Sequence, residues 1–252
     1  MAGGGATSNE VDRNGSLLAY HRQTVHYSVF GQPTAAAVRS ESMDSENAAA
    51  IERILAKLSE VRQLDPTCRL FGSNSHRYTL GPALTESEMA DYEKALGIAL
   101  PSEYRDFLMK IGHGGAGPFY GLFQLDGKDM ENPTNLDQIT KPFCWTDATN
   151  PTKWRSSGPE DGILIESSAA GDRYLEWWII PGVLYICNYG CALRFFMVAS
   201  GPQAGEVWMD KQADEKGIVP ECGEDGSRLH FLQWYEKWLD EGISRFRDEN
   251  AK

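Results

Sequence analysis

The chain lacks the short motifs that would assign it to a common enzyme class. It has no Gly-x-Ser-x-Gly stretch, no Lys-Ser/Thr pair after its glycine-rich stretch, and no two Cys-x-x-Cys pairs. These absences argue against a nucleophile-elbow hydrolase, a P-loop site and a four-cysteine zinc site. Basic residues are also scarce: 24 Lys and Arg stand against 36 Asp and Glu, a net charge of −12. That balance argues against direct binding to nucleic acid or to an anionic membrane.

Cysteines and uninterrupted apolar runs are few as well. The 252 residues include five scattered cysteines, so no disulfide scaffold is expected. The N-terminus shows no basic region followed by an apolar core, the pattern of a secretory signal. The longest apolar run, 177–199, is interrupted by Pro181, Asn188 and Arg194, which a simple membrane span would not tolerate. We therefore expect a cytoplasmic protein with no membrane-spanning segment.

A sizeable core is nevertheless expected, because 41% of the residues are hydrophobic and 27 are aromatic: seven Trp, ten Tyr and ten Phe. Residues 1–44 differ from the rest, since they combine a Gly3–Gly5 run with scattered polar residues. We expect a disordered or loosely attached tail there. A leading helix over 45–67 and a main domain over 68–252 complete the expected organisation.

Helical periodicity marks four segments. Residues between Ile51 and Val61 repeat with helical spacing, and Asp44 or Ser45 could cap that helix. Thr85–Glu88 fits a capping box, and Gly97 is placed to end the helix that it opens. A third helix is expected after Leu100-Pro101-Ser102, and a fourth near the C-terminus, between Phe231 and Phe246. The apolar positions expected on the helix faces are Ile51, Ile54, Leu55, Leu58 and Val61; Met89, Tyr92 and Leu96; Tyr104, Phe107, Leu108 and Ile111; and Phe231, Leu232, Tyr235, Trp238, Leu239, Ile243 and Phe246.

Extended segments dominate the second half of the chain. Glycine-containing turns separate short apolar runs, a pattern typical of antiparallel strands. Strands are expected at 162–166, 174–180, 183–187, 193–198 and 206–209, with further extended pieces at 70–72 and 76–80 and a polar loop at 211–228. Helices first, strands in the middle and a closing C-terminal helix predict the α+β class.

Cys187 and Cys191 lie close together in the most apolar part of the chain, 186–210. In one strand, residues four apart share a face, so both thiols could be small core residues. If 188–190 form a turn, the two would instead lie across a hairpin. A metal or redox site needs further ligands, and the sequence offers no second pair. We therefore expect no metal and no cofactor, and two packing cysteines.

Three segments occur in an order typical of one family. They are LTESEMADYEKALGIALPSEYRDFLMKIGHGGAGPFYGLFQLD (84–126), ICNYGCALRFFMVASGPQAGEVWMD (186–210) and LHFLQWYEKWLDE (229–241). Together they resemble the Smi/Knr family of the SUKH superfamily, most closely over 84–242. The resemblance implies an α+β fold with helices packed on a mainly antiparallel (mixed) sheet, and no catalytic residues. Bacterial members are viewed as immunity proteins that neutralise toxin domains, and fungal members resemble regulators of cell-wall synthesis.

The residues and the resemblance together predict a non-enzymatic protein-binding domain, with an immunity protein as the preferred hypothesis. Its expected partner is a cognate toxin domain with a basic surface, such as a nuclease, because opposite charges speed association. The alternatives are a regulatory or scaffold module with an endogenous partner, and a metal or redox protein that uses Cys187 and Cys191. Partner-binding residues are expected among acidic and aromatic groups on loops: Asp126, Asp129, Glu131, Trp145, Trp154, Glu160, Asp161, Glu176 and Trp177.

Overall fold

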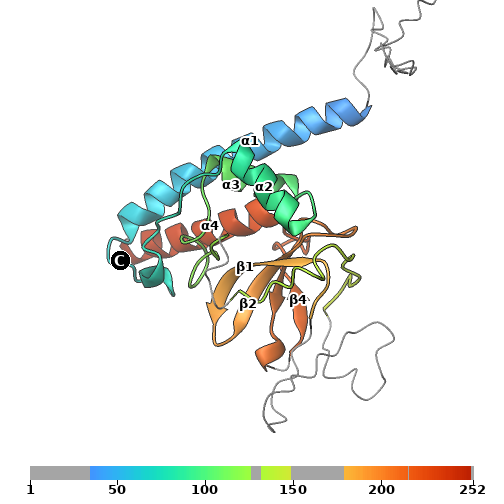
Figure 1. Cartoon of the computed structure of the whole chain (residues 1–252). Helices are drawn as coiled ribbons and strands as arrows, with labels where there is room; N and C mark the ends of the chain where they lie inside the picture. Colours follow the sequence, from blue (N-terminus) through green and yellow to red (C-terminus); the bar gives the residue numbers. More distant parts are fainter. Residues whose placement is uncertain (1–34, 126–131, 149–178, 215, 251–252) are drawn as a thin grey trace, which may run out of the picture. The chain divides into compact units, whose positions relative to one another are not determined.

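The computed structural model describes residues 35–125, 132–148, 179–214 and 216–250 (Figure 1). Its contacts divide the chain into two units, Met1–Glu41 and Ser42–Lys252, and the sheet and the core belong to the second unit. Helices come first, strands lie in the middle and a helix closes the chain, so the predicted α+β class is confirmed. The elements are α1 (Ala35–Leu64), η1 (Ser73–Ser75), α2 (Glu86–Leu96), α3 (Ser102–Lys110), β1 (Val183–Gly190), β2 (Leu193–Val198), β3 (Val207–Asp210), η3 (Gln212–Asp214), β4 (Ile218–Pro220) and α4 (Phe231–Asn250).

The α2 helix begins and ends where the sequence predicts. The Thr85 hydroxyl accepts the backbone N–H of Glu88 at 3.3 Å, and the Glu88 carboxylate accepts the backbone N–H of Thr85 at 2.8 Å. Both N–H groups would otherwise lack a partner at the helix start. Gly97 ends the helix in the left-handed conformation, with φ of 72°. The capping box is therefore confirmed.

The α1 helix departs from the sequence prediction at two points. It begins at Ala35, so Asp44 and Ser45 lie inside the helix and do not cap it. Leu55, expected on the buried face, is 46% exposed. The buried stripe follows 51, 54, 58 and 61, a narrow seam of alternating three- and four-residue steps, and Leu55 falls beside it.

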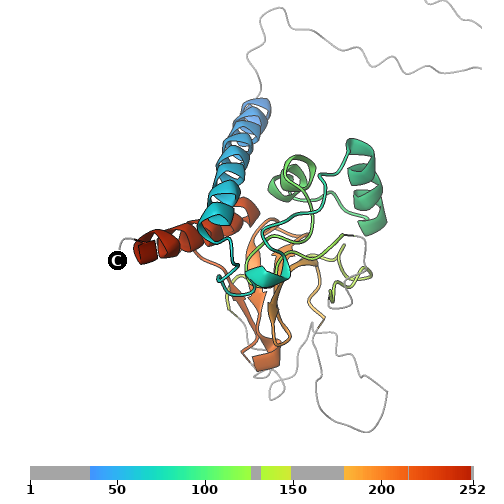
Figure 2. The same ribbon diagram turned by 90° about the vertical axis from the view of Figure 1, so that its left-hand side faces the viewer.

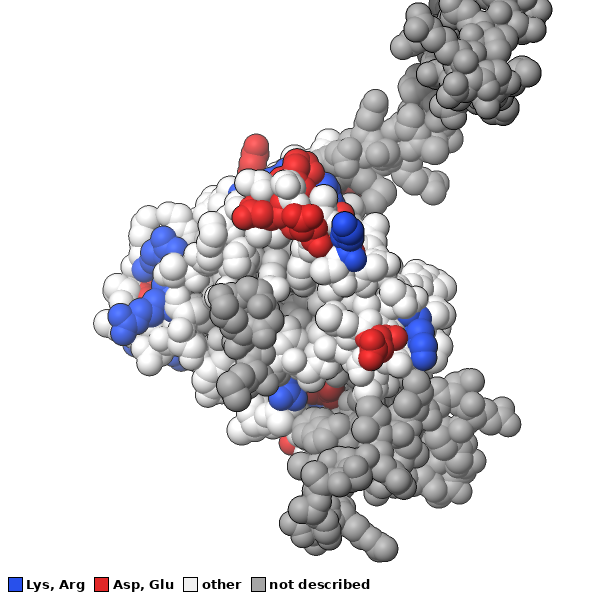
Figure 3. Space-filling view, in the orientation of Figure 1, with Lys and Arg blue, Asp and Glu red and all other residues white. Residues whose placement is uncertain are grey.

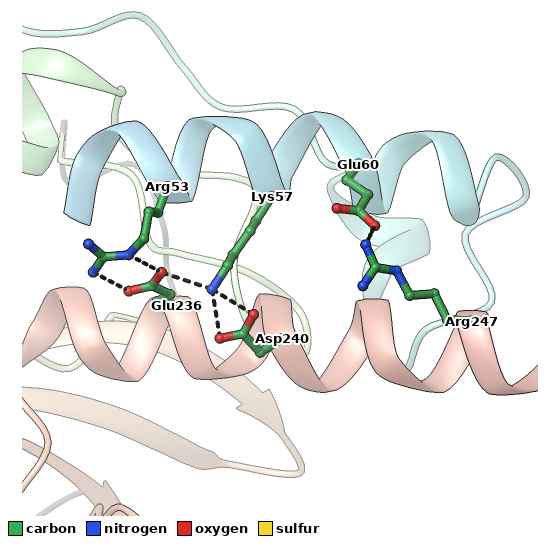
Figure 4. A network of polar contacts seen from close by, with 6 residues as sticks. All are labelled: Arg53, Lys57, Glu60, Glu236, Asp240 and Arg247. Carbon is green, nitrogen blue, oxygen red and sulfur yellow. Dashed lines mark hydrogen bonds and ion pairs between the residues drawn. The ribbon is translucent and has the colours of Figure 1, made fainter. Parts of the chain in front are cut away.

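The α1 and α4 helices lie side by side and are joined by ion pairs (Figure 4). The Glu236 carboxylate accepts from Arg53 Nε and from Lys57 Nζ, each at 2.8 Å. Burial alone would raise the pKa of Glu236, but these two hydrogen bonds hold it below its usual value. Exposed pairs stabilise little individually, so we attribute to this network mainly the alignment of the two helices. The other pairs are Lys57–Asp240 and Glu60–Arg247, both at 2.6 Å.

The strands of the described chain form one antiparallel sheet in the order β1-β2-β3-β4. Alternate residues point to opposite sides. Phe195 and Met197 join the large core cluster with the helices, whereas Phe196 and Val198 join a second cluster on the other face. Figures 1 and 2 show α3 and α4 on the same side of this sheet. Both faces are therefore buried, which explains the nearly continuous apolar runs.

The β1–β2 hairpin decides the position of the two cysteines. Gly190 pairs with Leu193, so Cys191 and Ala192 form a two-residue turn, and both have positive φ, 52° and 63°. Positive φ at both central positions is the type I′ arrangement that suits a twisted hairpin. Cys187 lies in β1 and is buried, whereas Cys191 is exposed at the turn. The expectation of two packing cysteines is thus wrong for Cys191.

Other segments differ from the sequence prediction as well. The β4 strand, Ile218–Pro220, falls in the expected polar loop, where three residues are too few to show a period. Segments 70–72 and 76–80 were expected to be extended, but they form turns around η1, apart from a single bridge at Leu80. The expected strand at 162–166 lies outside the described residues, as does 174–178, and Ile179 and Ile180 are not in a strand. Among the described helices, none is long and apolar enough to cross a membrane.

Candidate functional site

Four aromatic side chains from three separate segments meet beside the β1–β2 hairpin. Phe71 follows α1, Phe119 and Tyr120 belong to the glycine-rich loop 112–121 that follows α3, and Tyr189 lies in β1. The ring centroids are 5.5 Å apart for Phe71–Tyr120, 6.2 Å for Phe71–Tyr189 and 4.3 Å for Phe119–Tyr189. Phe71 is 55% exposed and Tyr120 is 43% exposed, although both are large and apolar. We call these four residues the aromatic surface.

Two glycines allow the aromatic surface to assemble. A Cβ atom on Gly72 would lie 2.1 Å from the carbonyl oxygen of Phe119, and one on Gly190 would lie 2.5 Å from the Tyr120 ring. Both glycines have positive φ, 80° and 100°, which other residues rarely adopt. The Phe71 loop and the hairpin can therefore approach the glycine-rich loop more closely than any side chain would permit.

The glycine-rich loop is fixed to the outer edge of β1. The backbone N–H of Tyr120 donates to the carbonyl of Asn188 at 3.0 Å, and the N–H of Asn188 donates to the carbonyl of Gly121 at 3.1 Å. Phe119 has φ of 54°, a strained value for a residue with a large side chain. The two hydrogen bonds that follow Phe119, at Tyr120 and Gly121, hold this conformation, in which the Phe119 ring contacts the Tyr189 ring.

The Phe71 loop is fixed by a buried carboxylate. Asp65 is 1% exposed and accepts the backbone N–H groups of Arg69 at 2.8 Å and Leu70 at 2.9 Å, and the Tyr78 hydroxyl at 2.7 Å. Burial alone would raise the pKa of Asp65, but these three donors hold it below its usual value. Phe71 directly follows this bonded segment, so its position depends on Asp65.

A groove lies between α4 and the end of the sheet that carries the β1–β2 hairpin, and it adjoins the aromatic surface. Phe119 and Tyr189 line both features, and the groove has a volume of about 340 Å³. From α4, Trp234, Lys237, Trp238 and Glu241 line one side at helical spacing. We call this feature the α4 groove. Its remaining lining residues are Pro118, Leu193, Phe195, Met209, Lys211, Asp214, Lys216 and Glu221.

The rim of the α4 groove mixes charges of both signs. Lys237 Nζ donates to the carbonyl of Cys222 at 3.2 Å, and Lys216 Nζ lies 3.6 Å from the Asp214 carboxylate. Glu221 is half-buried, and burial raises its pKa, with Lys237 opposing that shift. The arrangement offers aromatic faces and a few polar contacts, which suits binding to a protein surface.

Of the partner-binding residues predicted from the sequence, only Trp145 lies within the described residues. It is half-buried, and its ring meets Phe143 edge-on at 5.3 Å in the cluster on the other face of the sheet. It is therefore not part of the aromatic surface. The remaining predicted residues lie outside the described ranges: Asp126, Asp129, Glu131, Trp154, Glu160, Asp161, Glu176 and Trp177.

The sequence prediction missed the aromatic surface. Phe71 and Tyr120 each adjoin a glycine, in Leu-Phe-Gly and Phe-Tyr-Gly, and a glycine-rich stretch by itself predicts only a turn. Aromatic residues next to loop glycines were the available signal, because such residues are placed on the surface by backbone turns. Nothing in the sequence showed that the two loops meet.

The two close cysteines do not converge on a metal site. The Cys187 thiol is buried and lies 3.1 Å from the carbonyl oxygen of Pro118, and burial raises its pKa. Cys191 is exposed at the hairpin turn. Across the described ranges, no group of three or more His, Cys, Asp or Glu side chains is placed to hold a metal ion. A reactive thiolate is also disfavoured at Cys187, because the neutral thiol is the stable form in an apolar site.

Comparison with known proteins gives one family match. The SMI1 / KNR4 family (SUKH-1) matches residues 83–222, more than half of the chain. No curated protein and no solved structure matches. The matched range runs from just before the α2 capping box to just after β4, so it includes Phe119, Tyr120 and Tyr189, while Phe71 precedes it.

Proposed function

Because the chain belongs to the SMI1 / KNR4 family (SUKH-1), we propose that it is a non-enzymatic protein-binding domain that holds its partner on the aromatic surface. The observation that carries the proposal is the exposure of Phe71 and Tyr120, 55% and 43%, in a group of rings whose loops are hydrogen-bonded to β1 and to Asp65. Exposed apolar clusters with a polar rim are typical of interaction sites, and aromatic residues dominate the energy of such interfaces.

The finer proposal is that the chain is an immunity protein and that its partner is a cognate toxin domain with a basic surface. Its net charge of −12 supports this, because an acidic protein attracts a basic one over long distances. Figure 3 shows acidic side chains gathered at the top of the face, where Figure 1 places α2. The exposed acidic residues of α2 include Glu86, Glu88 and Asp91.

The test is co-expression with the toxin domain encoded beside this chain. We expect relief of toxicity and a purified complex. The double variant Phe71→Ala/Tyr120→Ala should weaken the complex about 10- to 100-fold, since interface aromatics typically contribute about 1–3 kcal/mol on truncation. Leu136→Ala is the matched control, because Leu136 is 56% exposed but lies outside the aromatic surface.

Two outcomes separate the coarse proposal from the fine one. If no neighbouring toxin is relieved and no complex forms with it, the immunity role is refuted. A complex with an endogenous protein that is lost in Phe71→Ala/Tyr120→Ala would then identify a regulatory or scaffold module that uses the same surface. A partner bound equally well by the double variant would refute the aromatic surface itself.

A further inference from the structure

The α4 groove is electrically balanced on a protein that is strongly acidic. Among the described residues, its rim carries as many lysines as carboxylates, and both signs occur on the α4 side and on the opposite side. The whole chain, in contrast, has a net charge of −12. A single charged group that enters the groove would meet both signs and gain little from either. The rim residues are Lys211, Lys216 and Lys237 against Asp214, Glu221 and Glu241.

We propose that the α4 groove binds an uncharged aromatic side chain of the partner protein. The inference rests on the proposed protein-binding function and names the group that the partner inserts. Tyr189, Trp234 and Trp238 line the groove, and aromatic rings gain from edge-on and offset contacts beyond the area that they bury. The lysines and carboxylates at the rim are then available for the backbone and polar neighbours of that side chain.

The size and position of the groove agree with one such side chain. A volume of about 340 Å³ is at the lower end for ligand pockets and suits one large side chain with part of its backbone. Phe119 and Tyr189 belong to the groove and to the aromatic surface, so both would be covered by one partner segment. Phe195 also lines the groove, with its ring centroid 5.3 Å from that of Trp234.

Different parts of the surface then have different roles. The acidic exterior, outside the groove, speeds the approach of a basic partner and is sensitive to salt. The groove holds an apolar side chain after docking, so changes there act on the dissociation rate. A partner whose dissociation is insensitive to salt while its association slows in salt would show this division.

The direct test is a titration of the full chain with N-acetyl-tryptophanamide. Two-dimensional NMR detects binding of this probe. We expect saturable shifts at the indole N–H groups of Trp234 and Trp238, with a dissociation constant on the order of 1 mM. N-acetyl-lysinamide and N-acetyl-glutamate should bind at least tenfold more weakly. Tyr189→Ala should weaken the tryptophan probe at least threefold, whereas Leu136→Ala should not change it.

The inference is overturned if the tryptophan probe leaves both indole signals in place, or if either charged probe binds as tightly. Comparing the probes on the unaltered chain needs no variant, so a poorly folded Tyr189→Ala does not weaken the test. If the probe binds but no toxin is relieved, the immunity role is refuted, while the proposal that the α4 groove binds an aromatic side chain is supported. If a toxin is relieved but the probe does not bind, the proposal of an aromatic side chain in the α4 groove is refuted, while the immunity role is supported.

Discussion

The bond between Tyr78 and Asp65 offers a sharp test of how the aromatic surface is held. The Tyr78 hydroxyl donates to the Asp65 carboxylate at 2.7 Å, and both side chains are 1% exposed. Tyr78→Phe removes this one donor and leaves the backbone N–H groups of Arg69 and Leu70 in place. A hydrogen bond to a charged group contributes about 1.5–3 kcal/mol, so we expect a loss of about 2 kcal/mol in the free energy of unfolding.

Equilibrium unfolding in urea at pH 7 measures this loss, and a decrease of about 4–8 °C in Tm should accompany it. Tyr120→Phe is the matched control, because Tyr120 is exposed, and its loss should be below about 0.5 kcal/mol. Asp65→Asn should cost more than Tyr78→Phe, because it weakens three bonds together. If Tyr78→Phe matches the unaltered chain within about 0.5 kcal/mol, the Tyr78 bond does not stabilise the fold; if Asp65→Asn matches it as well, the buried carboxylate does not fix the Phe71 loop.

The same carboxylate predicts a dependence on pH. The pKa of Asp65 is lower in the folded chain than in the unfolded chain, so its stabilisation is complete above the unfolded value, near about 4. It is lost as the pH falls through the folded pKa. The stability difference between the unaltered chain and Asp65→Asn should therefore persist at pH 7 and shrink below about pH 4. A difference that stays constant down to about pH 3 would contradict this assignment.

Each remaining prediction concerns the effect of replacing one residue. Cys187→Ala should cost about 1–2 kcal/mol because it empties a buried site, whereas Cys191→Ala at the exposed turn should cost less than about 0.5 kcal/mol. Thr85→Ala should cost about 1 kcal/mol because it removes the N-cap of α2. Burial lowers the pKa of His76 from 6.5 to about 4, so stability should fall as the pH drops between these values, and His76→Gln should flatten that slope. Gly190→Ala should destabilise the hairpin and weaken partner binding, because its Cβ would meet the Tyr120 ring.

Urea unfolding measures each of these changes in stability, and each has an outcome that would count against it. Equal losses for the two cysteine variants would mean that Cys191 is packed after all. A Thr85→Ser variant should keep most of the cap, so an equal loss in Ser and Ala would exclude the hydroxyl as its cause. If the free energy of unfolding of His76→Gln depends on pH as it does in the unaltered chain, another group causes that dependence. Unchanged partner binding in a folded Gly190→Ala would show that Tyr120 can move without consequence.

The sequence alone determined the features that depend on local spacing. The capping box from Thr85 to Glu88 and the glycine that ends α2 are set by neighbouring residues, and both are as predicted. The apolar face of α4 follows from helical periodicity, and Phe231, Tyr235 and Leu239 are buried. The β2 strand, Leu193–Val198, has the predicted bounds because turn residues border its apolar run and its partners β1 and β3 lie next to it in the sequence.

Only the tertiary structure decided the features that depend on segments far apart in the chain. Residues 70–72 form turns instead of the expected extended segment. The Asp65 carboxylate accepts hydrogen bonds from Arg69, Leu70 and Tyr78, and these bonds hold the loop in place. The three-residue β4 strand exists because β3 supplies its hydrogen bonds. The aromatic surface likewise unites Phe71 with Tyr120 and Tyr189, at separations in the chain that no periodicity records. Local patterns specify elements, whereas a binding surface is made by the contacts between them.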